Sequence, residues 1–101
     1  MHDWPLARRA DDMHFVYAIK SSLTNRIYIG QSNDFKRRLK DHNKGIVRST
    51  KQDRPWELIA LQEVNNRDRA RWKERQMKKS KGARDKWMFQ YAYGSESEIS
   101  K

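Results

Sequence analysis

Two short tyrosine-bearing segments, a basic helical stretch and one later carboxylate are the parts of this 101-residue chain best suited to chemistry. The tyrosine segments are Phe15-Val16-Tyr17 and Tyr28-Ile29-Gly30, and Arg38, His42 and Glu74 follow them. An arginine and a carboxylate-bound metal supply positive charge to a phosphate, while tyrosine and histidine can move a proton. The order and spacing of these residues therefore indicate a one-metal phosphodiesterase site.

Three strands are predicted to carry the sheet that positions these residues. The stretch from His14 to Lys20 is rich in strand-forming residues, and residues 26–30 alternate in polarity. The polar link at 21–25 suits an antiparallel hairpin between them. A third strand is predicted from Trp56 to Val64, directly after Pro55, because proline is tolerated where a strand begins.

Each predicted helix begins after a capping or breaking residue. Asn33 or Asp34 is expected to cap a helix that runs to about Asn43. Asn65 or Asn66 is expected to cap a second helix that runs to about Lys79. Gly82 precedes a third helix, from Ala83 to about Tyr93. The order ββαβαα predicts an α+β domain, in which helices flank a three-stranded antiparallel sheet.

Two polar residues share the apolar face of the first predicted helix. Phe35 and Leu39 form an i, i+4 stripe that should face the sheet. His42 continues this stripe, and Arg38 lies at its edge, so both are expected to approach the hairpin. Alternatively, Arg38 extends its charge into solvent and His42 is a hydrogen-bonded residue at the boundary of the core.

A carboxylate interrupts the apolar face of the second predicted helix. Ala70, Glu74 and Met77 lie at i, i+4 and i+7 on this face. Burying an unpaired carboxylate costs several kcal/mol, so Glu74 needs an arginine, a proton or a metal ion. The alternative is a structural ion pair with Lys78 or Arg71.

The composition favours a polyanionic partner. Lys plus Arg total 23 against 13 for Asp plus Glu, which gives a net charge of +10. Nucleic acid is the first candidate, an anionic membrane surface the second, and a merely soluble basic domain the alternative. The absence of cysteine excludes disulfides, a thiolate nucleophile and a zinc–thiolate site. No apolar run approaches the roughly 18 residues of a membrane span, so we expect a soluble cytoplasmic protein without membrane contact.

We expect one domain at residues 13–93, with a flexible N-terminal arm at 1–12 and a flexible C-terminal tail at 94–101. The ordered motifs of this domain resemble the GIY-YIG nuclease family, particularly its small stand-alone bacterial subgroup. The segments that carry the resemblance are 15–17 at the first motif, 28–30 at the second, 32–43 at the following helix, and 54–58 and 70–78 further along. Phe15 stands where the first motif's name has glycine, and Gln31 where some members have lysine.

The resemblance implies an endonuclease that hydrolyses DNA phosphodiester bonds with Mg²⁺, for which Mn²⁺ is a plausible substitute. Tyr17 would be the general base or would orient the attacking water, and Tyr28 would position water or phosphate. Arg38 would neutralise charge on the phosphate, His42 would help proton transfer, and Glu74 would hold the metal. Mg²⁺ suits a single carboxylate, because it keeps several waters and takes oxygens from the phosphate. Neighbouring cations are expected to lower the pKa of Tyr17.

We expect DNA phosphates to bind cations on the solvent side of the first helix and in the loop after it. These cations are Lys36, Arg37, Lys40, Lys44, Arg48 and Lys51. Phosphate contacts carry no base information, so low sequence specificity is predicted, unless a protein partner supplies it. The leading rival is a catalytically weak or inactive nucleic-acid-binding module. A basic scaffold for a protein partner is the third hypothesis, and it would leave Glu74 unexplained.

Overall fold

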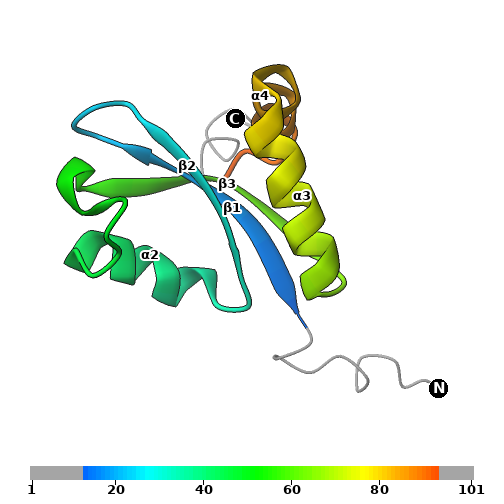
Figure 1. Cartoon of the computed structure of the whole chain (residues 1–101), viewed down its shortest axis with the longest axis horizontal. Coiled ribbons are helices and arrows are strands. Elements are labelled where there is room, and N and C mark those ends of the chain that lie inside the picture. Colours follow the sequence, from blue (N-terminus) through cyan, green and yellow to red (C-terminus); the bar gives the residue numbers. More distant parts are fainter. Residues whose placement is uncertain (1–12, 94–101) are drawn as a thin grey trace, which may run out of the picture.

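The computed structural model describes residues 13–93, and the arm and tail predicted at 1–12 and 94–101 lie outside the described residues. Three antiparallel strands form one sheet in the order β2-β1-β3 (Figure 1). The strands are β1 (His14–Ser21), β2 (Ile27–Ser32) and β3 (Trp56–Val64). The predicted α+β class and the order ββαβαα are confirmed.

The helices are α2 (Phe35–Lys44), α3 (Arg67–Lys79) and α4 (Lys81–Gln90), with a short 3-10 turn, η2 (Lys51–Asp53), before β3. The caps of α2 and α3 are among the predicted residues. The Asp34 carboxylate accepts from the Arg37 amide, and the Asn66 side chain accepts from the Arg69 amide. None of the helices within residues 13–93 is both long enough and apolar enough to cross a membrane.

The predicted bounds of the last helix are wrong at both ends. Ser80 ends α3, and its side chain caps α4 by accepting from the Ala83 amide. Gly82 therefore lies in the first turn of α4 and does not interrupt the helix. The helix ends at Gln90 because the residues after it pair with β3. Leu61 donates its amide to the Tyr91 carbonyl, and Tyr93 donates to Ile59.

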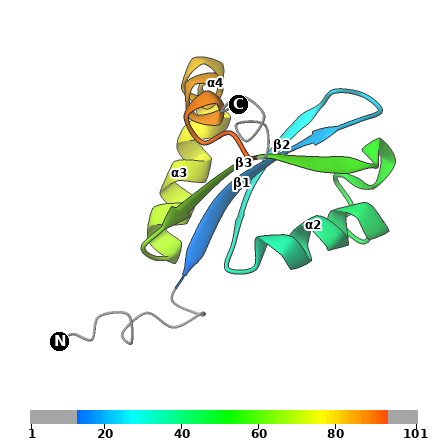
Figure 2. The same cartoon turned by 180° about the vertical axis from the view of Figure 1, so that it is seen from behind.

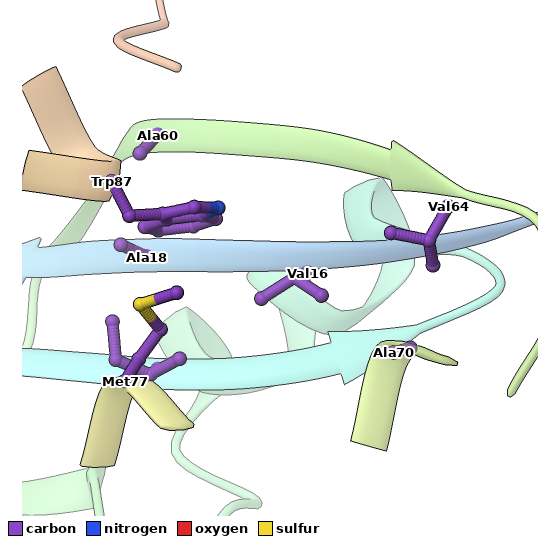
Figure 3. Close-up of a cluster of buried hydrophobic side chains, with 8 residues drawn as sticks. Val16, Ala18, Ala60, Val64, Ala70, Met77 and Trp87 are labelled. Atoms are coloured by element: carbon purple, nitrogen blue, oxygen red, sulfur yellow. The ribbon is translucent and has the colours of Figure 1, made fainter. Parts of the chain in front are cut away.

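The sheet separates two clusters of side chains, since alternate residues of a strand point to opposite faces. Helices α3 and α4 cover one face and α2 lies against the other (Figures 1 and 2). The α3/α4 face holds an apolar core, shown in Figure 3. Its buried residues are Val16, Ala18, Ile29, Ala60, Val64, Ala70, Met77 and Trp87.

The α2 face is built differently, because aromatic side chains with polar atoms form much of it. Tyr17, Ile19 and Trp56 are buried there, and Tyr28 packs against them. The predicted stripe of α2 is confirmed, since Phe35 and Leu39 pack against this cluster. Leu58 and Leu61 of β3 complete it.

The segment between α2 and β3 is tied to both elements. Gly45 ends α2 at φ 86, a left-handed conformation that favours glycine. The Asn43 side chain accepts from the Trp56 amide at 2.6 Å and donates to the Trp56 carbonyl at 3.0 Å. The Trp56 indole donates to the Thr50 carbonyl at 2.9 Å. These bonds fix the path of the loop and hold Thr50 close to α2.

Candidate active site

Three hydrogen bonds in a row lie at the centre of the α2 face. The Tyr17 hydroxyl is 3.1 Å from His42 Nε2, and His42 Nδ1 is 2.8 Å from Thr50 Oγ1. Thr50 Oγ1 donates in turn to the Val47 carbonyl at 3.3 Å. Tyr17 is 2% exposed, and His42 and Thr50 are fully buried. The helix stripe thus carries His42 inward, as expected, to a tyrosine of the first motif.

The number of available protons assigns a direction to this row. A threonine hydroxyl has one proton, and Thr50 donates it to Val47, so its oxygen accepts from His42 Nδ1–H. His42 Nε2 then carries the lone pair and accepts from the Tyr17 hydroxyl. The opposite direction would leave the Tyr17 proton without a hydrogen-bond acceptor among residues 13–93. Thr50 therefore holds the tautomer of His42 that can take a proton from Tyr17.

Gly30 of the second motif makes room for the tyrosine of the first. Tyr17 and Gly30 are direct partners in the β1–β2 ladder. A Cβ atom at position 30 would lie 2.5 Å from both Cζ and Oη of Tyr17, well inside van der Waals contact. The Tyr17 ring thus lies over the Gly30 backbone, and the hydroxyl reaches His42 only because residue 30 has no side chain.

Tyr28 forms the wall beside this pair. Its ring centroid lies 5.0 Å from that of His42 and 6.4 Å from that of Tyr17, both in edge-on or tilted contacts. Trp56 supports Tyr28 from the other side, with ring centroids 6.4 Å apart. The two predicted tyrosines and the histidine therefore share one aromatic cluster.

Arg38 lies at the mouth of the cluster, where its charge reaches both buried residues. Its side chain is 33% exposed, and its guanidinium is 3.5 Å from the Asp41 carboxylate. It lowers the pKa of Tyr17 through a hydrogen bond and its charge, and its charge also lowers the pKa of His42. Arg38 thus faces the site and is not simply extended into solvent.

Glu74 approaches the same tyrosine from α3, although that helix packs on the opposite face. Its carboxylate accepts from Lys78 Nζ at 2.7 Å, so the pair with Lys78 is present. The Glu74 side chain is 22% exposed and less buried than its place on the apolar stripe predicts. Its negative charge nevertheless raises the pKa of Tyr17. Lys78 Nζ lies 5.7 Å from the centroid of the Tyr28 ring, so both side chains reach the tyrosines past the β2 edge.

The pair of Glu74 and Lys78 does not exclude a metal-binding role. A partly exposed i, i+4 ion pair contributes only about 0.3–0.5 kcal/mol, so a divalent ion and a phosphate can replace it at small cost. No cluster of three or more histidines, cysteines or carboxylates that could hold a metal occurs within residues 13–93. Glu74 fits Mg²⁺ as the lone protein ligand, since that ion keeps waters and takes phosphate oxygens.

Arg38 lowers the pKa of Tyr17, as expected of a neighbouring cation, but burial has the larger effect. Burial raises this pKa to about 12, and the effect of Arg38 is too small to reverse it. Burial and the charge of Arg38 lower the pKa of His42 to about 4. At neutral pH Tyr17 is therefore a neutral donor and His42 a neutral acceptor.

The positions singled out around the site have clear locations. All six cations predicted to contact DNA are exposed, on the solvent side of α2 and in the segment after it. Their role stays a prediction.

Phe15, at the glycine position of the first motif, packs edge-on against Phe35 at 5.0 Å between ring centroids. Thr50 and Lys78 were missed as site residues. The spacing of four residues from Glu74 could have identified Lys78. No local pattern could have identified Thr50, because its position depends on the loop.

The comparison with protein families agrees with this geometry. A family model described as the GIY-YIG catalytic domain matches residues 13–87. This range contains every residue of the site and most of the 101-residue chain. No match was found among the curated proteins. The family is one of endonucleases, with a nuclease-type fold and nucleic-acid substrates. This chain belongs to the GIY-YIG family.

Proposed function

We propose that this protein is a Mg²⁺-dependent endonuclease that hydrolyses DNA phosphodiester bonds with low intrinsic sequence specificity. One observation carries the proposal: the hydrogen bond between Tyr17 and His42 lies within electrostatic reach of Arg38, and Tyr17 also lies within reach of Glu74. A proton acceptor, a fixed positive charge and a carboxylate for a metal are what hydrolysis of a phosphodiester requires. Packing alone has no need for this combination.

The raised pKa of Tyr17 favours a relay over a free tyrosinate. As the water oxygen bonds to phosphorus, the bond between phosphorus and the leaving oxygen breaks, and one water proton moves to the Tyr17 hydroxyl oxygen. The leaving oxygen takes a proton from solvent water. Tyr17 passes its own proton to His42 Nε2 in the same step and stays neutral throughout. Burial and Arg38 hold His42 neutral beforehand. The negative charge of a bound phosphate offsets Arg38 and makes the imidazolium accessible.

The remaining residues act on the phosphate. Arg38 provides positive charge for the oxygens that gain charge in the transition state. Tyr28 orients water or phosphate against His42. Glu74 would hold Mg²⁺, and that ion would supply further neutralising charge and polarise the phosphoryl group. Mn²⁺ has the same preference for oxygen ligands and is expected to substitute.

Low sequence specificity follows if phosphate contacts provide most of the affinity. The exposed cations of α2 and the loop after it suit such contacts. A protein partner that brings the domain to particular sites remains part of the proposal. Nothing in the site favours the rival view of an inactive binding module, because the catalytic side chains converge at one place.

A cleavage assay on single-stranded, duplex, flap and junction DNA tests this proposal. Cleavage is expected with Mg²⁺ or Mn²⁺, and EDTA should abolish it. Products from unrelated sequences should appear at similar rates. A Tyr17→Phe protein purified in the same way controls for contaminating nuclease. Binding of all four DNA forms without cleavage by either metal would establish the binding module instead.

A further inference from the structure

A groove of about 410 Å³ runs along the free edge of β2, beside the tyrosine cluster. Its walls come from β2, the end of α3, the start of α4 and Ser49 of the loop. Tyr28 and Lys78 line it and also border the candidate active site. The groove therefore lies next to the candidate active site.

The charged residues that line the groove are all cations: Arg26, Lys78, Lys81 and Arg84. All four of them pair with carboxylates outside the lining, Arg84 through Nε at 3.7 Å from Asp85. Arg26 pairs with Asp53 at 2.6 Å, Lys78 with Glu74 at 2.7 Å, and Lys81 with Asp85 at 3.0 Å. These pairs hold the cationic groups in place, so part of the entropy cost of ordering them is met before a ligand binds.

Arg26 and Arg84 have the most constrained positions. Arg26 Nη1 also donates to the Ser49 carbonyl at 2.8 Å, and its guanidinium lies 5.8 Å from the Trp56 ring centroid. Arg84 Nε is buried and has no hydrogen bond within residues 13–93, since the Asp85 carboxylate is 3.7 Å away. A buried donor without an acceptor costs about 1–3 kcal/mol. Arg84 also lines the groove, so its guanidinium adds positive charge to that surface.

We propose that this groove is a second phosphate site, which holds the backbone of the nucleic-acid strand next to the scissile phosphate. The inference rests on the proposed function, because it takes the occupant to be the strand that the site cleaves. The groove's volume of about 410 Å³ lies within the range of ligand pockets. The cations of its lining supply the positive charge that a phosphodiester backbone requires.

Binding of a labelled single-stranded oligonucleotide in EDTA tests the groove separately from catalysis. The variant is Lys81→Gln/Arg84→Gln, and the control is Lys86→Gln, an exposed lysine of α4 outside the lining. The double variant should bind at least about 10-fold more weakly. The slope of log K against log salt should become shallower by roughly 1.4, which is about 0.7 for each of two phosphates on a single strand. With Mg²⁺, KM should rise while kcat stays near that of wild type.

The outcomes separate the two proposals. Wild-type protein that cleaves DNA, with a double variant that binds as tightly as Lys86→Gln, overturns the groove and leaves the endonuclease intact. Wild-type protein that never cleaves, with the predicted loss of affinity in the double variant, overturns the endonuclease and supports the groove. If the double variant melts early, Lys81→Gln alone is used, since this side chain is 77% exposed, and about half the change in slope is expected.

Discussion

The same strands form both faces of the sheet, but the two faces differ in the side chains that they bury. On the α3/α4 face, Val16, Ala18 and Met77 form an apolar core with Trp87. On the α2 face, buried positions are given to Tyr17, His42 and Thr50, which hydrogen-bond in a row. The period of two along β1 places Val16 and Tyr17 on opposite sides. The α3/α4 face is thus packed with apolar side chains, and the α2 face holds the candidate active site.

Glu74 connects the two faces. Its helix belongs to the apolar face through Ala70 and Met77, yet its carboxylate affects the pKa of Tyr17 on the other face. The edge position of β2 makes this possible, because no strand within residues 13–93 lies beyond it. Substitutions on the two faces should therefore have separate effects, on stability or on cleavage. Glu74 tests this separation most directly, because its helix belongs to one face and its charge acts on the other.

Glu74→Gln should abolish Mg²⁺-stimulated cleavage and leave folding intact. The change removes the negative charge that would hold the metal and keeps the shape of the side chain. Cleavage rate, DNA binding and thermal melting are measured together, with the exposed Glu57→Gln as control. Normal cleavage would place the metal elsewhere, and unfolding would show that the pair with Lys78 is structural.

Tyr17→Phe should lower kcat by at least about 10²-fold, the low end for a residue in general acid–base catalysis. Only the hydroxyl that donates to His42 is lost, and the ring still fills the space over Gly30. Tyr28→Phe should lower kcat by less. Single-turnover rates check both, with the partly exposed Tyr93→Phe as control. Rates within a few-fold of wild type for both site variants would contradict the relay.

Met77→Ala should affect the other face, with a loss of about 2–5 kcal/mol in the free energy of unfolding. The side chain is 6% exposed in the apolar core, so its removal leaves a cavity. Denaturant unfolding measures the loss. Cleavage at a temperature where the variant is fully folded should stay within a few-fold of wild type. A large fall in kcat under those conditions would mean that the two faces are coupled.

The free energy of unfolding should fall as the pH is lowered from about 6.5 toward 4, by on the order of 2–3 kcal/mol from His42. The pKa of His42 is lowered to about 4 in the folded protein, so the unfolded chain binds its proton first. The stabilisation is complete above pH 6.5 and is lost as the pH approaches 4. Urea titrations of wild type and His42→Asn measure it. If the free energy of unfolding depends on pH in the same way in both proteins, His42 is not held neutral in the folded state.

Thr50→Val should lower kcat by about tenfold, the smallest of these effects, while Thr50→Ser should retain most activity. Valine keeps the volume but leaves His42 Nδ1–H without its acceptor, which costs about 1–3 kcal/mol. ¹⁵N NMR of His42 reads the tautomer directly. Wild type and Thr50→Ser should show the proton on Nδ1, and Thr50→Val a mixture. An unchanged spectrum in Thr50→Val would show that Thr50 does not fix the tautomer.

Local patterns were sufficient to predict the order of elements along the chain, the caps of α2 and α3, and the inward face of α2. Phe35, Leu39 and His42 follow helical spacing, so their shared face could be derived without knowing what lies opposite. The place of Thr50 could not, because it depends on the bonds between Asn43 and Trp56 at the two ends of a loop. The net pKa of Tyr17 could not be predicted for a related reason: burial in the folded chain outweighs the nearby arginine.

The two edges of the sheet differ in their exposure to other molecules. Residues 91–93 pair with β3 and satisfy part of its backbone, whereas no strand in the described part of the chain lies beyond β2. A bare edge can recruit a strand from another copy and begin aggregation. Arg26 and Lys78 lie along this edge, and like charges on a second copy would repel them. Cations along this edge therefore disfavour edge-to-edge association of two copies of the domain.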